Sequence, residues 1–289
     1  MKIVRSIADL RRTLTAIRRR LPVGLVPTMG AWHDGHLALI RAARREGCIT
    51  VASIFVNPAQ FNDPADLAAY PRDEERDARM AADEGADVLF VPTVEEMYPQ
   101  GFATWVDIAG AAQGLEGDLR PGHFRGVATV CLKLFTIVEP AMSFFGQKDA
   151  QQVAVIEQLV RDLNLPLEIR IVRTVRDADG LALSSRNVRL SPDDRQRALA
   201  IPRALHAGLA AYASGDDPIV AARRVLKGLD VEYVSVANFS GRHTLAIAAR
   251  VGGTRLLDNA GLDDELITPG GGSAADALGQ ELEHVEQSI

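Results

Sequence analysis

Short apolar runs alternate with amphipathic segments over the first 172 residues, and this rhythm limits the fold more than any other feature. The runs cover 23–26, 49–56, 88–91, 143–145 and 167–172, and the run at 49–56 is rich in β-branched residues. Between them, apolar side chains recur at helical spacing. Strands that are covered by helices on both faces need such continuous apolar runs. The sequence therefore predicts an α/β fold built on a doubly wound parallel sheet, whose ligands bind beyond the carboxyl ends of the strands.

The pattern changes after Thr174. A polar loop at 176–187 comes first. Helical patterns and strand-like runs then follow at 192–213, 217–228, 231–236, 245–251 and 254–257. The last two runs are joined through Gly252-Gly253, which is typical of a hairpin. We therefore expect two domains, a sheet domain at 1–174 and a smaller α+β domain at 175–289.

The end of the chain differs from both domains. Residues 268–275 contain Pro-Gly-Gly-Gly-Ser and have no apolar period. Such a composition is typical of a linker, so we expect 268–289 to form a flexible tail.

Charge and cysteine content exclude several function classes. The 289 residues carry a net charge of −6, which gives no global attraction for nucleic acid. No uninterrupted run of about 18 apolar residues predicts a membrane span, and no signal peptide is indicated. Cys48 and Cys131 lack the spacing of a disulfide framework or a thiolate zinc site. We therefore expect a cytoplasmic protein without nucleic-acid or membrane partners.

Arginines at 11, 12, 18, 19 and 20 admit two interpretations, a nucleic-acid arm or the solvated face of a helix. Ile7, Leu10 and Leu14 recur at helical spacing behind a candidate cap at Ser6, with Asp9 three residues further on. This pattern favours a packed surface helix.

Two histidines follow the first buried strand, in the segment Pro27–His36. His33 and His36 flank Gly35 at the expected start of a helix. Backbone N–H groups and the helix dipole would face a triphosphate there, while the imidazoles donate to its oxygens. A zinc site would need further ligands, and the histidines at 123, 206 and 243 show no matching spacing. Idle core or surface histidines are the other alternative.

Amides follow the second strand. Asn57 and Gln60 can hydrogen-bond the hydroxyls and carboxylate of a small substrate without adding charge. A plain Asn-Pro turn is the competing interpretation.

Two further segments carry cations. Lys148 follows a strand through Gly146 and suits phosphate oxygens, whereas Asp149 is a candidate ligand or a plain helix cap. Gln152 is spaced to face the same side as Asp149. In the loop 179–187, two serines and Arg186 suit phosphate, although a solvent-facing turn would have the same composition.

Taken together, these segments closely resemble the pantothenate synthetase family of the nucleotidyltransferase superfamily. The likeness runs from about residue 23 to Leu262. It rests on motifs that occur together and in the family's order: PTMGAWHDGH, SIFVNPAQF, AYPRD, LRPGHFRGVATV, FGQKDAQQ, DGLALSSRN and TRLLDN.

The resemblance implies a fold and a reaction. It implies a Rossmann-like domain at 1–174 that binds ATP and pantoate, and a lid domain at 175–289. The reaction is the ligation of (R)-pantoate to β-alanine through a pantoyl adenylate, with ATP split to AMP and pyrophosphate. Mg²⁺ as cofactor and a cytoplasmic homodimer are implied as well.

By resemblance, His36 takes the family's proton-donor role, and His33, Lys148 and Arg186 join it as catalytic residues. Gln60 and Gln152 would bind pantoate, with Gln60 also near the β-alanine position. The ATP contacts would come from Met29, Gly30, Ala31, Trp32, His33, Asp34, Gly35, His36, Gly146, Gln147, Lys148, Asp149, Val175, Leu183, Ser184, Ser185 and Arg186. No metal ligand is assigned.

Three positions depart from the family pattern, without removing an implied ligand. Trp32 stands where leucine is common, Gln147 where glutamate is frequent, and Arg189 where an aromatic residue is usual. Residues after Asp263 have no clear counterpart. Two other functions share the motifs in part: an adenylyltransferase that leaves AMP on its product, and a non-catalytic nucleotide-binding module.

Overall fold

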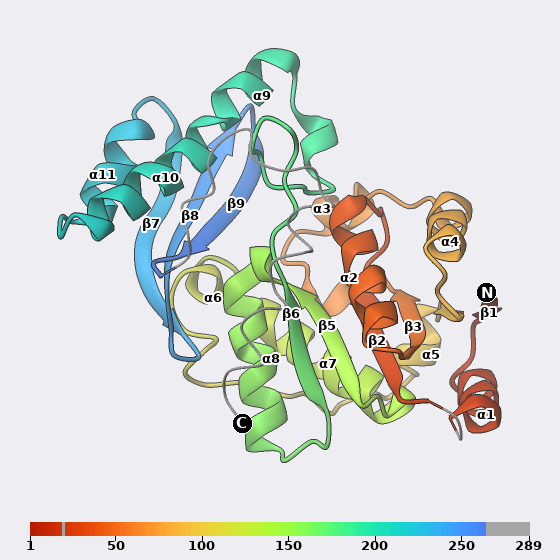
Figure 1. Cartoon of the computed structure of the whole chain (residues 1–289). Coiled ribbons are helices and arrows are strands. Elements are labelled where there is room, and N and C mark those ends of the chain that lie inside the picture. The colour runs from red at the N-terminus through yellow and green to blue at the C-terminus, as the bar shows by residue number, and fades with distance from the viewer. Residues whose placement is uncertain (19–20, 264–289) are drawn as a thin grey trace. The chain divides into compact units, whose positions relative to one another are not determined.

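A computed structural model describes residues 1–18 and 21–263 (Figure 1). The tail expected at 268–289 lies outside the described residues. The described chain forms two compact units. Unit 1 comprises Met1–Thr174 with Asn238–Arg242, and unit 2 comprises Val175–Ala237 with residues 243–263.

Unit 1 contains a six-stranded sheet in which every pair of neighbouring strands is parallel. The strands, in their order across the sheet, are β1 (Lys2–Val4), β4 (Val88–Phe90), β3 (Ile49–Ile54), β2 (Val23–Thr28), β5 (Met142–Gly146) and β6 (Glu168–Val172). The predicted doubly wound parallel sheet is thus confirmed. The sequence did not predict β1, a short edge strand in which only Val4 is buried.

Helices cover both faces of this sheet (Figure 1). On one face lie α1 (Ile7–Ile17), α7 (His123–Val138) and α8 (Ala150–Asp162), and on the other lie α2 (Asp34–Arg45) and α4 (Glu74–Asp83). Successive strand residues alternate between the two cores: Val88 and Phe90 join the first, and Leu89 joins the second. This double burial explains the uninterrupted apolar runs.

The amino-terminal segment is a packed helix over its described part, as its spacing predicts. The Ser6 hydroxyl accepts the backbone N–H of Asp9, and Leu10 and Leu14 are buried. The shorter elements of unit 1 are η1 (Pro58–Gln60), α3 (Pro64–Ala68), α5 (Val94–Met97), α6 (Glu116–Leu119) and η2 (Gln147–Asp149).

Unit 2 combines helices with an antiparallel sheet. Its elements are η3 (Asn187–Arg189), α9 (Pro192–Ala198), α10 (Ala200–Ala213), α11 (Pro218–Val225), β7 (Asp230–Phe239), β8 (Arg242–Val251) and β9 (Thr254–Gly261). The expected hairpin is present, because Val251 pairs with Thr254 across Gly252-Gly253, both of which have positive φ. The single helix expected at 192–213 is two helices, since Pro202 has no N–H to donate to Ala198.

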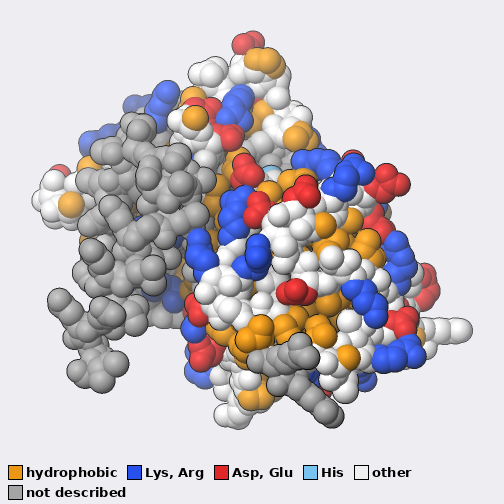
Figure 2. Space-filling view, turned by 45° about the vertical axis from the view of Figure 1, so that its right-hand side comes forward, with side chains coloured by type: hydrophobic (Ala, Val, Ile, Leu, Met, Phe, Trp, Pro, Cys, Tyr) orange, Lys and Arg blue, Asp and Glu red, His pale blue; other side chains and the backbone are white. Residues whose placement is uncertain are grey.

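The surface has no dominant charge on the side drawn in Figure 2, where basic and acidic side chains are interspersed. Both cysteines are buried free thiols, in line with the prediction that they form no disulfide framework. Among the helices of the described residues, none is both long and apolar enough to cross a membrane.

Candidate active site

The order of the strands places two of the candidate segments at one edge of the sheet. β2 lies between β3 and β5, so the chain leaves β2 toward β3 and later returns to its other side. Such a switch point is where ligands bind in doubly wound sheets. The β2–β5 ladder ends at Leu25 and Ser143, before either strand ends. Residues 29–36 follow β2, and residues 147–149 follow β5.

The two histidines after β2 close the start of α2. His33 is the N-cap residue, and its Nδ1 accepts the N–H of Gly35 at 3.1 Å. His36 Nδ1 accepts the N–H of His33 at 3.3 Å, which completes a capping box. The ring centroids are 4.2 Å apart. Because both Nδ1 atoms are acceptors, the hydrogen of each neutral ring lies on Nε2.

Gly35 is required by the first of these rings. A Cβ on residue 35 would lie 2.8 Å from Cε1 of His33 and 2.9 Å from its Nδ1. The spacing His-x-Gly-His thus has a local reason, since only glycine lets the preceding imidazole fold back onto the helix start.

His36 is neutral at physiological pH. Burial above all, with electrostatic contributions from the neighbouring His33 and Lys148, lowers its pKa to about 3. His36 follows β2 and Lys148 follows the neighbouring parallel strand β5, so both segments lie in a common region at the same edge of the sheet. His36 therefore offers a neutral Nε2–H donor in that region.

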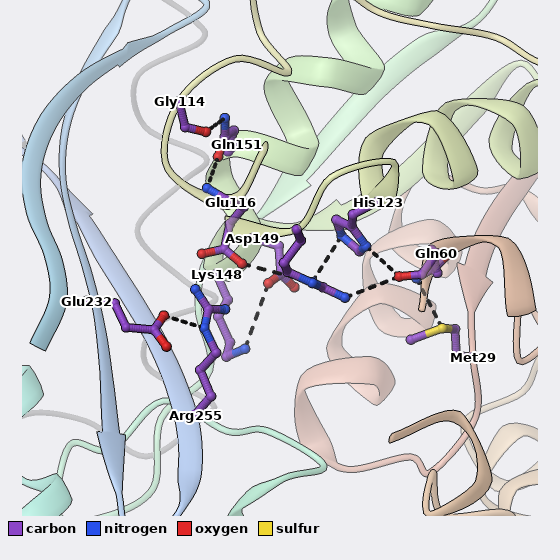
Figure 3. A network of polar contacts seen from close by, with 11 residues as sticks. Met29, Gln60, Gly114, Glu116, His123, Lys148, Asp149, Gln151, Glu232 and Arg255 are labelled. Atoms are coloured by element: carbon purple, nitrogen blue, oxygen red, sulfur yellow. Dashed lines mark hydrogen bonds and ion pairs between the residues drawn. The ribbon is translucent and has the colours of Figure 1, made fainter. Parts of the chain in front are cut away.

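Asp149 is not the plain helix cap that competed with its functional interpretation. It occupies the N-cap position of α8, but its side chain makes no capping hydrogen bond. Instead its carboxylate lies 3.9 Å from the Lys148 ammonium (Figure 3). The two charges therefore sit side by side beyond the end of β5.

The expectation that backbone N–H groups after β2 face an anion is wrong for several residues. The N–H of Gly30 donates to Thr28 Oγ1 at 3.1 Å. The N–H groups of Ala31 and Trp32 donate to the two carboxylate oxygens of Asp77, at 2.7 and 3.0 Å. Those of His33 and Gly35 donate to imidazole nitrogens, as described above. The donors that this segment directs away from the helix start are therefore the imidazole Nε2 atoms.

Trp32 belongs to the core rather than to the lining of a site. Its side chain is 1% exposed, and its Nε1–H donates to Thr28 Oγ1 at 2.9 Å. Because this position is apolar and buried, both tryptophan and the leucine common in the family can fill it with a large apolar side chain.

Gln60 is held in one orientation by its neighbours. Asn57 Nδ2 donates to Gln60 Oε1 at 3.0 Å and to the carbonyl of Gly126 at 3.1 Å. The Tyr98 hydroxyl in turn donates to Asn57 Oδ1 at 2.9 Å. Gln60 Nε2 points toward Met29 Sδ, 3.2 Å away (Figure 3). Gln60 therefore presents its amide hydrogens toward the segment that follows β2.

The backbone of Gln60 is also fixed. His123 Nδ1–H donates to the Gln60 carbonyl at 2.9 Å, and Arg120 Nη2 donates to it at 3.3 Å. Arg120 Nη1 lies 3.1 Å from His123 Nε2. Burial, and secondarily the charge of Arg120, lower the pKa of His123 to about 4. His123 is thus a neutral support for Gln60.

Gln151, which the sequence analysis did not identify, holds the loop at 111–116 in place through hydrogen bonds. Gln151 is 6% exposed, and its side chain donates to the carbonyls of Ala111 and Gln113. It also donates to the carbonyl of Gly114, and its Oε1 accepts the N–H of Glu116 (Figure 3). Gln152, the predicted pantoate ligand, follows it in the first turn of α8 and is half-buried.

In unit 2, the candidate phosphate loop is fastened to β9. Arg176 makes a bidentate ion pair with the buried carboxylate of Asp258, with distances of 2.6 and 2.9 Å. The N–H of Leu183 donates to the Val175 carbonyl at 3.0 Å. The residues Ser184, Ser185 and Arg186 that follow are half-buried. Asp258 belongs to the TRLLDN motif, which explains why that motif accompanies the loop.

No group of three or more His, Cys, Asp or Glu side chains suited to hold a metal ion occurs within residues 1–18 and 21–263. The zinc interpretation of His33 and His36 therefore finds no further ligands in that part of the chain.

The family model for pantoate–β-alanine ligase matches residues 2–261. The chain belongs to this family. Curated relatives include the pantothenate synthetases of Moorella thermoacetica, 48% identical over 280 residues (91% of this chain, 99% of the relative), and of Rhizorhabdus wittichii, 50% identical over 275 residues (90% and 98%). The resemblance seen in the sequence motifs is confirmed.

Solved structures of family members have the same fold. The pantothenate synthetase of Thermus thermophilus is 43% identical, with a TM-score of 0.86 over 91% of this chain and 99% of that one. The pantoate–β-alanine ligase of Francisella tularensis, described as complexed with β-γ ATP and β-alanine, is 34% identical, with a TM-score of 0.80 over 91% and 98%.

Proposed function

We propose that this chain is an ATP-dependent ligase that joins pantoate to β-alanine and releases AMP and pyrophosphate. The observation that carries the proposal is the pair of imidazoles at the switch point. Both accept a backbone N–H of the helix start at Nδ1 and have Nε2–H on the far side of the ring, and Lys148 follows the neighbouring strand β5. Membership of the pantoate–β-alanine ligase family supplies the substrates.

The reaction has two displacements. The pantoate carboxylate attacks the α-phosphorus of ATP, and pyrophosphate leaves with the electron pair of the broken P–O bond. The amine of β-alanine then attacks the acyl carbon of the adenylate, loses a proton and expels AMP. No enzyme nucleophile is needed, so positioning and charge stabilisation provide the acceleration.

In the first displacement one anion approaches another. Lys148 and Arg186 offset this repulsion as phosphate-binding cations. His33 and His36 donate hydrogen bonds from Nε2 to phosphate oxygens. Burial lowers the pKa of His36 to about 3, which supports its Nε2–H acting as a neutral hydrogen-bond donor.

Pantoate is bound by amides. Gln60, oriented by Asn57 and supported by His123, donates to the pantoate carboxylate or hydroxyl, and Gln152 does so from α8. The ATP contacts proposed for 29–36, 146–149, Val175 and Leu183–Arg186 follow the family motifs. Unit 2 acts as the lid that shields the adenylate from water.

Mg²⁺ enters this scheme with ATP. Mg²⁺ keeps several waters and commonly binds substrate phosphates with one or two carboxylates, so it needs no cage of protein ligands. An ion carried by the triphosphate would need only one or two carboxylates from the chain. Asp149, beside Lys148 after β5, is a carboxylate that could hold the ion, which would neutralise the leaving pyrophosphate. We also propose that the protein is a cytoplasmic homodimer. Sedimentation velocity would test the dimer by measuring the mass of the particle in solution.

Isotope exchange between ATP and pyrophosphate tests the function. We expect exchange that depends on pantoate, and formation of free AMP once β-alanine is added. Exchange without pantoate, or AMP retained on the product, would indicate an adenylyltransferase. ATP binding with no exchange under any condition would indicate a non-catalytic module.

A further inference from the structure

We propose that Asp77 is a positioning residue for the two site histidines. It acts through the Gly30–Trp32 turn, which leads from β2 to His33. Asp77 lies on α4, its side chain is 1% exposed, and it belongs to none of the sequence motifs discussed above. The inference rests on the proposed function of His33 and His36.

Both oxygens of the Asp77 carboxylate accept hydrogen bonds from the turn. Oδ2 accepts the N–H of Ala31 at 2.7 Å, and Oδ1 accepts that of Trp32 at 3.0 Å. Hydrogen bonds to a buried carboxylate are stronger than those between neutral groups. One side chain thus fixes two consecutive peptide units, and the bond to Ala31 has the length of a charge-assisted hydrogen bond.

The turn needs these hydrogen bonds because two of its residues have positive φ angles. Gly30 has φ of 84° and Ala31 has φ of 54°, so an alanine occupies the left-handed region that non-glycine residues disfavour. The fit is also close, since a Cβ on Gly30 would lie 3.0 Å from Asp77 Oδ2 and 3.0 Å from Ile54 Cγ2. The bonds to Asp77 compensate for the strain at Ala31.

The turn determines where the imidazoles lie. Trp32 directly precedes His33, whose N–H donates to His36 Nδ1 at 3.3 Å, the longest bond in the capping box. If the turn relaxes, His33 moves with Trp32, this bond lengthens and the Nε2 donors are displaced. Small displacements of positioned groups are costly in catalysis.

Substitution Asp77→Asn tests this role. The carboxamide keeps one acceptor, but its NH₂ group faces the second backbone N–H. We expect kcat/KM for ATP to fall by about tenfold or more, while the KM for pantoate stays unchanged, because Gln60 is held by other residues. Removing a negative charge would by itself tighten the binding of ATP, which is an anion. A fall in kcat/KM for ATP would therefore report a change in geometry rather than in charge.

Asp83→Asn is the matched control, because Asp83 is an exposed carboxylate on the same helix. It should leave both parameters unchanged. The double variant Ala31→Gly with Asp77→Asn should recover part of the lost activity, because glycine adopts a positive φ without strain. An unchanged kcat/KM for ATP in Asp77→Asn, an equal loss toward pantoate, or no recovery in the double variant would each overturn the inference.

Amide hydrogen exchange on the unaltered protein gives a test that does not depend on the variants folding or on ligase activity. The amides of Ala31 and Trp32 should exchange slowly although they lie outside helices and strands. Fast exchange at both would overturn the role of Asp77. A protein with slow exchange but no ligase activity would refute only the proposed function.

Discussion

Lowering the pH from 7.5 to 5 should destabilise unit 1 through two imidazoles, those of His36 and His123. Burial lowers their pKa values to about 3 and about 4, so both are neutral in the folded protein at pH 5. In the unfolded chain both return to the ordinary value of about 6.5 and bind protons. The unfolded state therefore binds more protons, and the free energy of unfolding falls as the pH drops below 6.5.

The size of this loss follows from the unfolded pKa. At pH 5 each unfolded imidazole lies about 1.5 pH units below its pKa, and one unit corresponds to about 1.4 kcal/mol. Each histidine thus removes about 2 kcal/mol, and the two together remove about 4 kcal/mol. Such a loss is large beside a typical stability of about 5–15 kcal/mol.

Urea unfolding followed by tryptophan fluorescence measures the effect, because both tryptophans, Trp32 and Trp105, lie in unit 1. His123→Asn keeps a donor for the Gln60 carbonyl but cannot be protonated. It should lose about 2 kcal/mol less than the parent between pH 7.5 and pH 5. An identical pH loss in parent and variant would refute the reasoning, as would an NMR titration of His36 centred near 6.5.

Three further outcomes follow from the site. Lys148→Ala and His36→Ala should each lower turnover by about 10² or more in a pyrophosphate-release assay, and near-native rates would remove the roles given to them. Gln60→Ala should raise the KM for pantoate, and an unchanged value would count against its assignment. In Gly126→Ala the new Cβ would lie 2.4 Å from the Ala59 carbonyl oxygen. Thermal denaturation should therefore show that the free energy of unfolding falls by about 1–3 kcal/mol, and the KM for pantoate should rise. Equal stability of parent and variant would show that α7 can shift to remove the clash.

The elements predicted from the sequence are those whose burial leaves a local pattern. The central strands are covered on both faces, which imposes continuous apolar runs. β1 has three residues and one buried side chain, which is too little to form a pattern. The break between α9 and α10 has a local cause in Pro202, but it lies within a continuous helical period.

The site residues that the sequence predicts are likewise those whose place is set by nearby sequence. His33, His36 and Lys148 directly follow strands, and their positions can be read from neighbours in the chain. Asp77 and His123 act on segments 46 and 63 residues away, and no local pattern records such contacts. The LRPGHFRG motif was the available signal for His123, whereas Asp77 had none.

The capping box also explains why imidazoles, rather than other side chains, occupy both positions beside Gly35. A neutral imidazole is a rigid ring that accepts at one nitrogen while it donates from the other, on its far side. A hydroxyl is too short to do both across such a span, and ammonium and guanidinium groups only donate. Each imidazole thus accepts a backbone N–H of the helix start at Nδ1 and presents Nε2–H to an anion on its other side, so a replacement must supply both an acceptor and a donor at this separation.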